Sequence, residues 1–376
     1  MALEGGFGGF GGFGGFGGFG GFGGFGGFGG TPAFDNQALI QNRDGIVGSW
    51  VAPGADVPTQ LAQESRTNLR RWEPWVRATL VDFDLVSRLR FGSDGSGFTL
   101  WDVDVQHLGT GQALTVAAQP IVSMVRPPDD SATSQLWAQQ LDILVNWAEL
   151  RSERCAEILS QLSPPIVFWA SLLNLRPDRH PATLELLWTG LRLANAVEMR
   201  FKHALACRRA VEMSPQVQPM IATPGHGSLP SGHATESCLS AQLLWRLVSK
   251  ADTTKTYPWF DQLMRQAARV AINRTVAGLH FPIDSVAGQL LGLTLADYLV
   301  HRAELSPSVN STYDAWKFDG GQFPGRHDFQ WRDAFVPGSD QRTTTAYFNK
   351  TNAQPLEAAG SPPLHALWKA ARREWR

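Results

Sequence analysis

The chain is poor in cysteine and carries almost no net charge. Only 3 of its 376 residues are cysteines, namely Cys155, Cys207 and Cys238. These are too few and too scattered for a disulfide framework or a zinc site, so we expect them to be small core residues. The 33 basic and 34 acidic residues leave a net charge of −1, which indicates neither a nucleic-acid partner nor an anionic membrane surface.

Long apolar runs are also missing. A membrane span needs about 20 predominantly apolar residues. The most apolar stretches, Ile166–Leu175 and Phe281–Val300, are too short or are interrupted by Asp284 and Asp297. No basic segment followed by an apolar one opens the chain, as it would in a secretory signal peptide. We therefore expect a soluble, cytoplasmic protein without a membrane span.

Residues 1–33 contain a low-complexity repeat. From Gly5 to Gly30 the sequence repeats Gly-Gly-Phe, and the repeat contains no proline, which argues against a collagen triple helix. Ordering so many glycines costs too much backbone entropy, whereas evenly spaced phenylalanine rings attract one another. We expect a flexible tail that self-associates or binds a surface. The alternative is a low-complexity expansion without a function.

The rest of the chain changes from mixed to helical periodicity. In residues 34–130, a short helical pattern covers Val57–Trp75, and Phe98–Val105 alternates apolar with polar residues, as in a half-buried strand or β-ribbon. Residues 306–376 show little periodicity, and we expect them to wrap the core irregularly. The predicted fold is mainly α, a helical bundle with a small β-ribbon in its N-terminal part. The helices expected in the core, residues 131–305, cover Ser134–Leu162, Pro181–Ala210, Ser231–Lys250, Tyr257–Ala277 and Pro282–Ala303.

Chemically active side chains concentrate in three separate segments of this core. Together they supply fixed cations, a hydroxyl group, a backbone N–H at a glycine and two imidazoles, one of them close to a carboxylate. Such groups can hold a tetrahedral oxyanion and perform acid–base or covalent chemistry on it. The segments are Lys202 with Arg209, Pro230-Ser231-Gly232-His233, and Arg274 with His280 and Asp284.

Two of these segments are expected at helix N-termini. Ser231 and Gly232 precede an apolar-periodic run, so Ser231 is predicted near the N-cap, where unpaired backbone N–H groups attract anions. His233 then falls in the first turn. His280 and Asp284 are four residues apart, so they can share a helix face, and Asp284 can accept the N–H of the imidazole.

Each segment also has an ordinary structural explanation. Lys202 and Arg209 alone would form a solvated helix face, and Ser231 alone would be a helix cap. His280 beside a carboxylate would be a structural pair. Because all three segments occur together in one order, an oxyanion site is the better interpretation.

The combination of Lys-x6-Arg, Pro-Ser-Gly-His and Arg-x5-His-x3-Asp resembles the superfamily shared by vanadium-dependent haloperoxidases and type 2 phosphatidic acid phosphatases. The likeness covers roughly residues 195–300. It implies a helical bundle of the acid phosphatase and haloperoxidase type. It also implies that vanadate or phosphate is held by Lys202, Arg209, Ser231, Gly232 and Arg274.

The resemblance further implies roles for the histidines. His280 would be the covalent partner of the oxyanion, either as the vanadium ligand of a haloperoxidase or as the phosphohistidine nucleophile of a phosphatase. Asp284 would orient it, and His233 would be the general acid–base. His226, seven residues before His233, matches a histidine of the family's bromoperoxidases, where chloroperoxidases have an aromatic residue. The alternative for His226 is an exposed loop histidine.

The sequence departs from the family pattern at two positions. Ala210 follows Arg209 where the family usually has proline, and Asn273 precedes Arg274 where serine is common. Neither change removes a charge, so the site is expected to persist. Arg208 adjoins Arg209, which leaves two guanidinium groups as candidates for the anion.

These residues predict a haloperoxidase that oxidises halide, most readily bromide, with hydrogen peroxide, with vanadate as its cofactor. The alternative is a soluble acid phosphatase that hydrolyses phosphate esters through His280 and needs no cofactor. A binding protein without turnover would not need both His233 and His280, and a scaffold with a dead core would have lost residues that are all present here. By the same resemblance we expect a homodimer.

Overall fold

The computed structural model separates into two compact units, a smaller one that ends at Trp75 and a larger one that begins at Val76. The smaller unit contains helix α1 (Ala33–Ile46) and a 3-10 helix, Asn68–Arg71. The expected Gly/Phe tail lies, apart from its last residue, outside the described residues. The division of the chain at residues 33, 130 and 305 stays a prediction. The described residues are 33–49, 59–93, 95–107, 114–129, 131–304, 313–351 and 360–376.

The helix expected over Val57–Trp75 is not formed. The described part of this segment is irregular apart from the 3-10 helix, and the first helix after it, α2, covers Pro74–Val86. Proline has no backbone N–H and disfavours helical backbone in the residue before it. Pro74 therefore suits the first position of α2 and cannot continue a helix from upstream. The prediction was wrong because it gave apolar spacing more weight than this proline.

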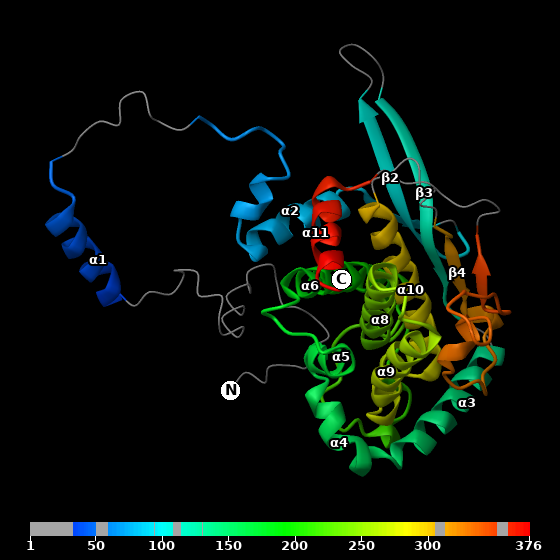
Figure 1. Cartoon of the computed structure of the whole chain (residues 1–376). Coiled ribbons are helices and arrows are strands. Elements are labelled where there is room, and N and C mark those ends of the chain that lie inside the picture. The colour runs from blue at the N-terminus through cyan, green and yellow to red at the C-terminus, as the bar shows by residue number, and fades with distance from the viewer. Residues whose placement is uncertain are drawn as a thin grey trace. The chain divides into compact units, whose positions relative to one another are not determined.

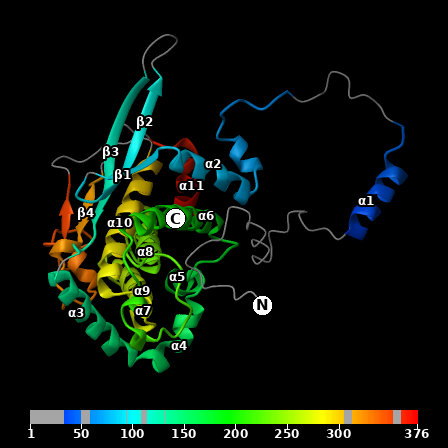
Figure 2. The same cartoon turned by 180° about the vertical axis from the view of Figure 1, so that it is seen from behind.

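A five-stranded sheet in the order β1-β2-β3-β4-β5 flanks the helices of the larger unit (Figures 1 and 2). Its first three strands form an antiparallel meander, and the strand expected over Phe98–Val105 is part of β2. β4 pairs parallel with β3, and β5 pairs antiparallel with β4. The C-terminal segment thus contributes two strands where no regular element was expected. The strands are β1 (Leu89–Ser93), β2 (Phe98–His107), β3 (Leu114–Val125), β4 (Trp316–Asp319) and β5 (Phe348–Lys350).

Helices dominate the larger unit, and α8 is at their centre (Figure 1). It packs against α6, α9 and α10, and α10 in turn contacts β3 and β4. The mainly α fold with a small sheet is therefore confirmed. No helix in the described ranges is long and apolar enough to cross a membrane. The remaining helices are α3 (Ser131–Ala148), α4 (Arg151–Ser160), α5 (Ile166–Leu173), α6 (Pro181–Leu205), α7 (Ala210–Met213), α8 (Gly232–Ala251), α9 (Tyr257–Val276), α10 (Pro282–Ala303) and α11 (Pro362–Arg373).

The helix expected over Ser134–Leu162 is divided into α3 and α4. The break lies just before Arg151, whose guanidinium group donates to the backbone carbonyl oxygens of Val217, Gln218 and Val276, each at 2.9 Å. These contacts tie the start of α4 to the end of α9 and to the loop before α8. Tertiary hydrogen bonds of this kind outweigh the local preference for a continuous helix.

Helices α8 and α10 approach closely because α10 has glycines at their contact. A Cβ on Gly292 would overlap the carbonyl oxygen of Thr235, and one on Gly288 would lie 2.6 Å from the carbonyl oxygen of Ser231. Both neighbours are backbone atoms, which cannot rotate away. The glycines therefore set the spacing of two helices whose first turns carry candidate site residues.

We expect Gly292→Ala to destabilise the fold by about 1–3 kcal/mol, because the added methyl group over-packs the contact between α8 and α10. Thermal unfolding of the purified variant measures the loss. Gly92→Ala in β1 is a suitable control, since a Cβ there meets nothing within 4 Å. Equal unfolding temperatures for the two variants would contradict the close helix contact.

Candidate functional site

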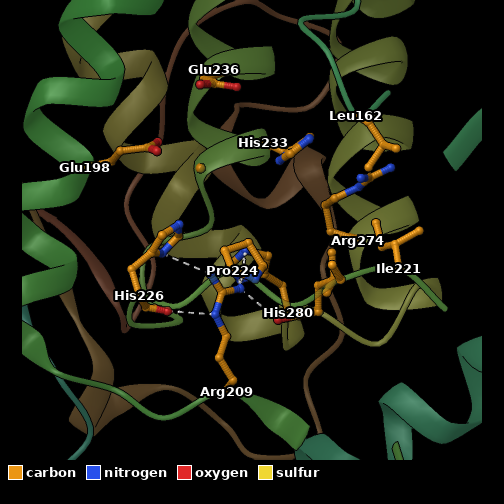
Figure 3. A pocket seen from close by; sticks show the side chains of 13 residues that line it. Leu162, Glu198, Arg209, Ile221, Pro224, His226, His233, Glu236, Arg274 and His280 are labelled. Carbon is orange, nitrogen blue, oxygen red and sulfur yellow. Dashed lines mark hydrogen bonds between the residues drawn. The ribbon is translucent and has the colours of Figure 1, made fainter. Parts of the chain in front are cut away.

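Residues from all three sequence segments meet at a cavity of about 30 Å³ at the starts of α8 and α10 (Figure 3). Lys202, Ser231 and Asp284 are not in its wall, but Asp284 is hydrogen-bonded to His280, which is. Apolar side chains complete the lining, so the charged groups are shielded from bulk water. The lining residues are Leu162, Glu198, Arg209, Ile221, Ala222, Pro224, His226, Gly232, His233, Glu236, Arg274, Leu279 and His280.

Arg274, near the end of α9, is a buried cation with free donors. Its Nη2 donates to the carbonyl oxygen of Ile158 at 3.0 Å and to Oε1 of Gln161 at 3.2 Å. Its Nε and Nη1 have no hydrogen-bond partner among the described residues. Burial lowers the pKa of Arg274 to about 10, so the group remains positively charged at neutral pH. A buried guanidinium with unused donors indicates a place for an anion.

His280 stands immediately before α10 and is oriented by Asp284. The Nδ1 atom of His280 lies 3.1 Å from Oδ2 of Asp284. A carboxylate accepts, so Nδ1 carries the proton and Nε2 carries the lone pair. Burial, together with the positive charges of Arg209 and Lys202, holds the pKa of His280 well below its usual value. The imidazole is therefore neutral, as a nucleophile or a metal ligand must be.

Asp284 accepts several of the hydrogen bonds that hold His280 and the start of α10. Besides His280, its Oδ2 accepts hydrogen bonds from the hydroxyl group of Ser228 and from the backbone N–H of Phe281, the latter at 3.0 Å. Burial raises the pKa of Asp284 to about 6, although these hydrogen bonds and nearby cations oppose the change. At neutral pH the carboxylate is thus mainly ionised and can fix the ring of His280.

Arg209 faces the cavity, whereas Arg208 is exposed. Arg209 donates from Nη1 to Nε2 of His280 at 2.9 Å and from Nε to the carbonyl oxygen of His226 at 3.0 Å. Of the two adjacent guanidinium groups, only that of Arg209 is positioned to meet an anion beside His280. Glu212 accepts the backbone N–H of Arg209 at 2.6 Å, which holds the start of α7 without the usual proline of the family.

His233 lies in the first turn of α8, as expected. Its Nε2 is 2.9 Å from the carbonyl oxygen of Gln161. A carbonyl oxygen only accepts, so Nε2 carries the proton and Nδ1 is the basic atom. Burial and the positive charge of Arg274 lower the pKa of His233 to about 3. The ring is therefore neutral at ordinary pH, and its Nδ1 atom carries a lone pair.

Lys202 and Ser231 support the loop before α8 instead of lining the cavity. The amino group of Lys202 donates to the carbonyl oxygens of Gly227, Ser228 and Pro230. Ser231 is the N-cap of α8, as predicted, and its Oγ accepts the backbone N–H of Ala234 at 3.4 Å. Its own N–H donates to the carbonyl oxygen of Asp284 at 2.9 Å, which ties the starts of α8 and α10 together.

Glu198 on α6 and Glu236 on α8 line the cavity but were not predicted. Glu198 lies four residues before Lys202, and Glu236 lies three residues after His233. Helical spacing from these predicted residues places both glutamates on the same faces and could have identified them. Glu198 is buried, and its Oε2 has no hydrogen-bond partner in the described part of the chain.

Comparison with known proteins agrees with this geometry. Residues 185–305, which include most of α6 and all of α8, α9 and α10, match the PAP2 superfamily. The chain contains a PAP2 superfamily domain. It is also similar to a vanadium-dependent bromoperoxidase from Ascophyllum nodosum, with 26% identity in an alignment of 119 residues that covers 26% of this chain. The matched part spans 21% of the length of that relative. The resemblance inferred from the three motifs is thus confirmed at the level of the superfamily.

Proposed function

We propose that the cavity binds a tetrahedral oxyanion and that the protein is a vanadium-dependent haloperoxidase, oxidising bromide with hydrogen peroxide. The observation that carries the proposal is the pair of unused donors on buried Arg274. Leaving such donors unpaired costs free energy that a bound anion would recover. Gly232 at the positive end of α8 and neutral His280 line the same cavity, so an anion there would meet every group that the reaction needs.

The residues present fit vanadate. Arg274 and Arg209 would neutralise the charge of its oxygens, and Nε2 of His280 would be the vanadium ligand. Lys202, which does not line the cavity, would add a positive charge without direct contact. Bound vanadate would supply a Lewis-acid centre that activates peroxide toward halide. Arg209 donates to Nε2 of His280 in this structure, so that hydrogen bond has to break before the lone pair can be used.

The histidines in the wall provide the proton chemistry. Nδ1 of His233 is free to take a proton from hydrogen peroxide, since Nε2 is engaged by Gln161. His226 lines the same cavity, and its Nδ1 lies 3.1 Å from Nη2 of Arg209. A second imidazole at this position, together with the similarity to a bromoperoxidase, favours halide oxidation.

A second candidate function, phosphate-ester hydrolysis, is supported by the pairing of His280 with Asp284. With Nδ1–H held by Asp284, Nε2 of His280 is arranged as a nucleophile. It would form a bond to phosphorus while the bond from phosphorus to the ester oxygen breaks. The leaving oxygen would take its proton from His233, whose pKa an adjacent anion raises. Water would then hydrolyse the phosphohistidine and regenerate His280.

A paired assay on metal-stripped protein tests both candidates. One arm contains vanadate, hydrogen peroxide, bromide and a chromogenic halogen acceptor, and the other contains a chromogenic phosphate monoester. We expect bromination that depends on vanadate and is suppressed by phosphate, because the two anions compete for one cavity. Ester hydrolysis that vanadate inhibits, without bromination, would replace the haloperoxidase with a phosphatase. Turnover in neither arm would refute both.

A further inference from the structure

Two glutamates stand in the wall of a cavity that otherwise favours anions. Figure 3 shows the carboxyl groups of Glu198 and Glu236 on the same side of the cavity as His233. Glu198 is only 2% exposed, and a Cβ built on Gly232 would lie 2.7 Å from its Oε1. The carboxyl group of Glu198 therefore lies directly over the first residue of α8. That is where the helix N-terminus would contact an oxyanion.

An ionised carboxylate at this position would repel the anion and cancel the charge of a cation beside it. Burial of Glu198 outweighs the attraction of Lys202 and Arg209 and raises its pKa to about 7. Burial and the nearby charge of Glu198 raise the pKa of Glu236 well above its usual value. Both groups are thus easily protonated. A protonated carboxyl group can donate a hydrogen bond to an oxyanion.

We propose that Glu198, backed by Glu236, donates a hydrogen bond from its protonated carboxyl group to the bound oxyanion, so that anion binding takes up a proton from solvent. This inference rests on the proposed oxyanion site, but it holds for either of the two reactions. The bound anion would then be the hydrogen-bond partner of Glu198 Oε2, which has none among the described residues. It also explains why acidic residues are compatible with an anion site, since the carboxyl pair becomes neutral when the anion arrives.

A metal ion bridging the two carboxylates is the other chemical role that such a pair could have. In the described ranges, no group of three or more His, Cys, Asp or Glu side chains is placed to hold one. Other charged or titratable groups also surround the cavity near Glu198 and Glu236. They are Lys202 on α6, Arg209 before α7, His226 in the loop between α7 and α8, His233 on α8, Arg274 on α9 and His280 before α10.

Calorimetric titration with molybdate tests the proposal without any turnover. Molybdate is a tetrahedral dianion that does not itself titrate between about pH 6 and 9, unlike phosphate or vanadate. Titrations in buffers of different ionisation enthalpy give the number of protons taken up on binding. For the wild type we expect uptake above pH 7, and an affinity that falls by up to about tenfold for each further pH unit.

In Glu198→Gln the amide still donates a hydrogen bond but does not titrate. We expect this variant to retain the affinity that the wild type shows at low pH, with less proton uptake than the wild type and a pH profile that keeps only the contribution of Lys202. Lys202→Arg separates the contribution of Lys202, whose pKa burial lowers to about 8, because arginine does not titrate in this range. Uptake that persists in Lys202→Arg but is lost in Glu198→Gln belongs to the carboxyl pair.

Glu185→Gln is the matched control. Glu185 lies on α6 about 20 Å along the helix from Glu198 and pairs with Arg77, so this variant should bind molybdate like the wild type. A Glu198→Gln protein with the proton uptake and pH profile of the wild type would overturn the inference. Failure of the wild type to bind molybdate at all would instead overturn the oxyanion site itself.

Discussion

His280→Ala is expected to lose turnover by about 10⁴-fold or more, whichever of the two reactions the protein catalyses. Nε2 of His280 is the atom that would bind vanadium or attack phosphorus. Asp284 holds the opposite nitrogen, and burial keeps the ring neutral. His233, by contrast, has its Nε2 atom on the carbonyl oxygen of Gln161. The measurement is the specific activity in both arms of the paired assay.

The loss in His280→Ala should be chemical and not due to unfolding. The variant is expected to retain cooperative thermal unfolding, and added imidazole should restore part of the activity by entering the space that the ring leaves. His203→Ala on α6 is the matched control, because His203 is exposed. An unchanged activity in His280→Ala would remove His280 from the mechanism, and with it the assignment of the cavity as the active site.

The sequence motifs identified the parts of the site that depend on local structure. Ser231 is the N-cap of α8, and His280 and Asp284 pair across the first turn of α10, because N-caps and four-residue spacing follow directly from helix geometry. The boundaries of α8, α9 and α10 were predicted closely for the same reason, whereas the helix expected over Pro181–Ala210 ends at Leu205. Prolines in the first turn define the starts of α6, α9 and α10, and the N-cap Ser231 defines the start of α8.

Features that depend on tertiary contacts were not predictable in this way. The four-residue spacing places Glu198 on the same helix face as Lys202, but its burial over Gly232 depends on the packing of α8 against α6. The orientation of Arg209 depends on a carbonyl oxygen of the loop at His226, far along the chain from it. Likewise, β4 and β5 form because β3 offers an edge for pairing, which the sequence of the C-terminal segment does not reveal.

His233→Ala is expected to lower turnover by about 10²–10⁴-fold, the usual contribution of a general acid–base. The affinity for molybdate should change much less, because His233 is neutral and supplies no fixed charge to the anion. A calorimetric titration and a kcat measurement on the same preparation separate the two effects. A variant that loses binding and turnover equally would indicate a structural role for His233.

The pH dependence of kcat identifies the reaction that His233 serves. Its pKa of about 3 belongs to the protein without an anion, and a bound oxyanion raises it by favouring the charged ring. If His233 accepts the proton of hydrogen peroxide, it must be neutral, so kcat is lost as the pH falls through the raised pKa. If it protonates the leaving oxygen of an ester, it must be charged, so kcat is lost as the pH rises through that pKa. In His233→Ala the pH profile of kcat should lose the decline that His233 causes, on the acidic side in the first case and on the alkaline side in the second. The side on which it disappears therefore distinguishes a haloperoxidase from a phosphatase built on one set of residues.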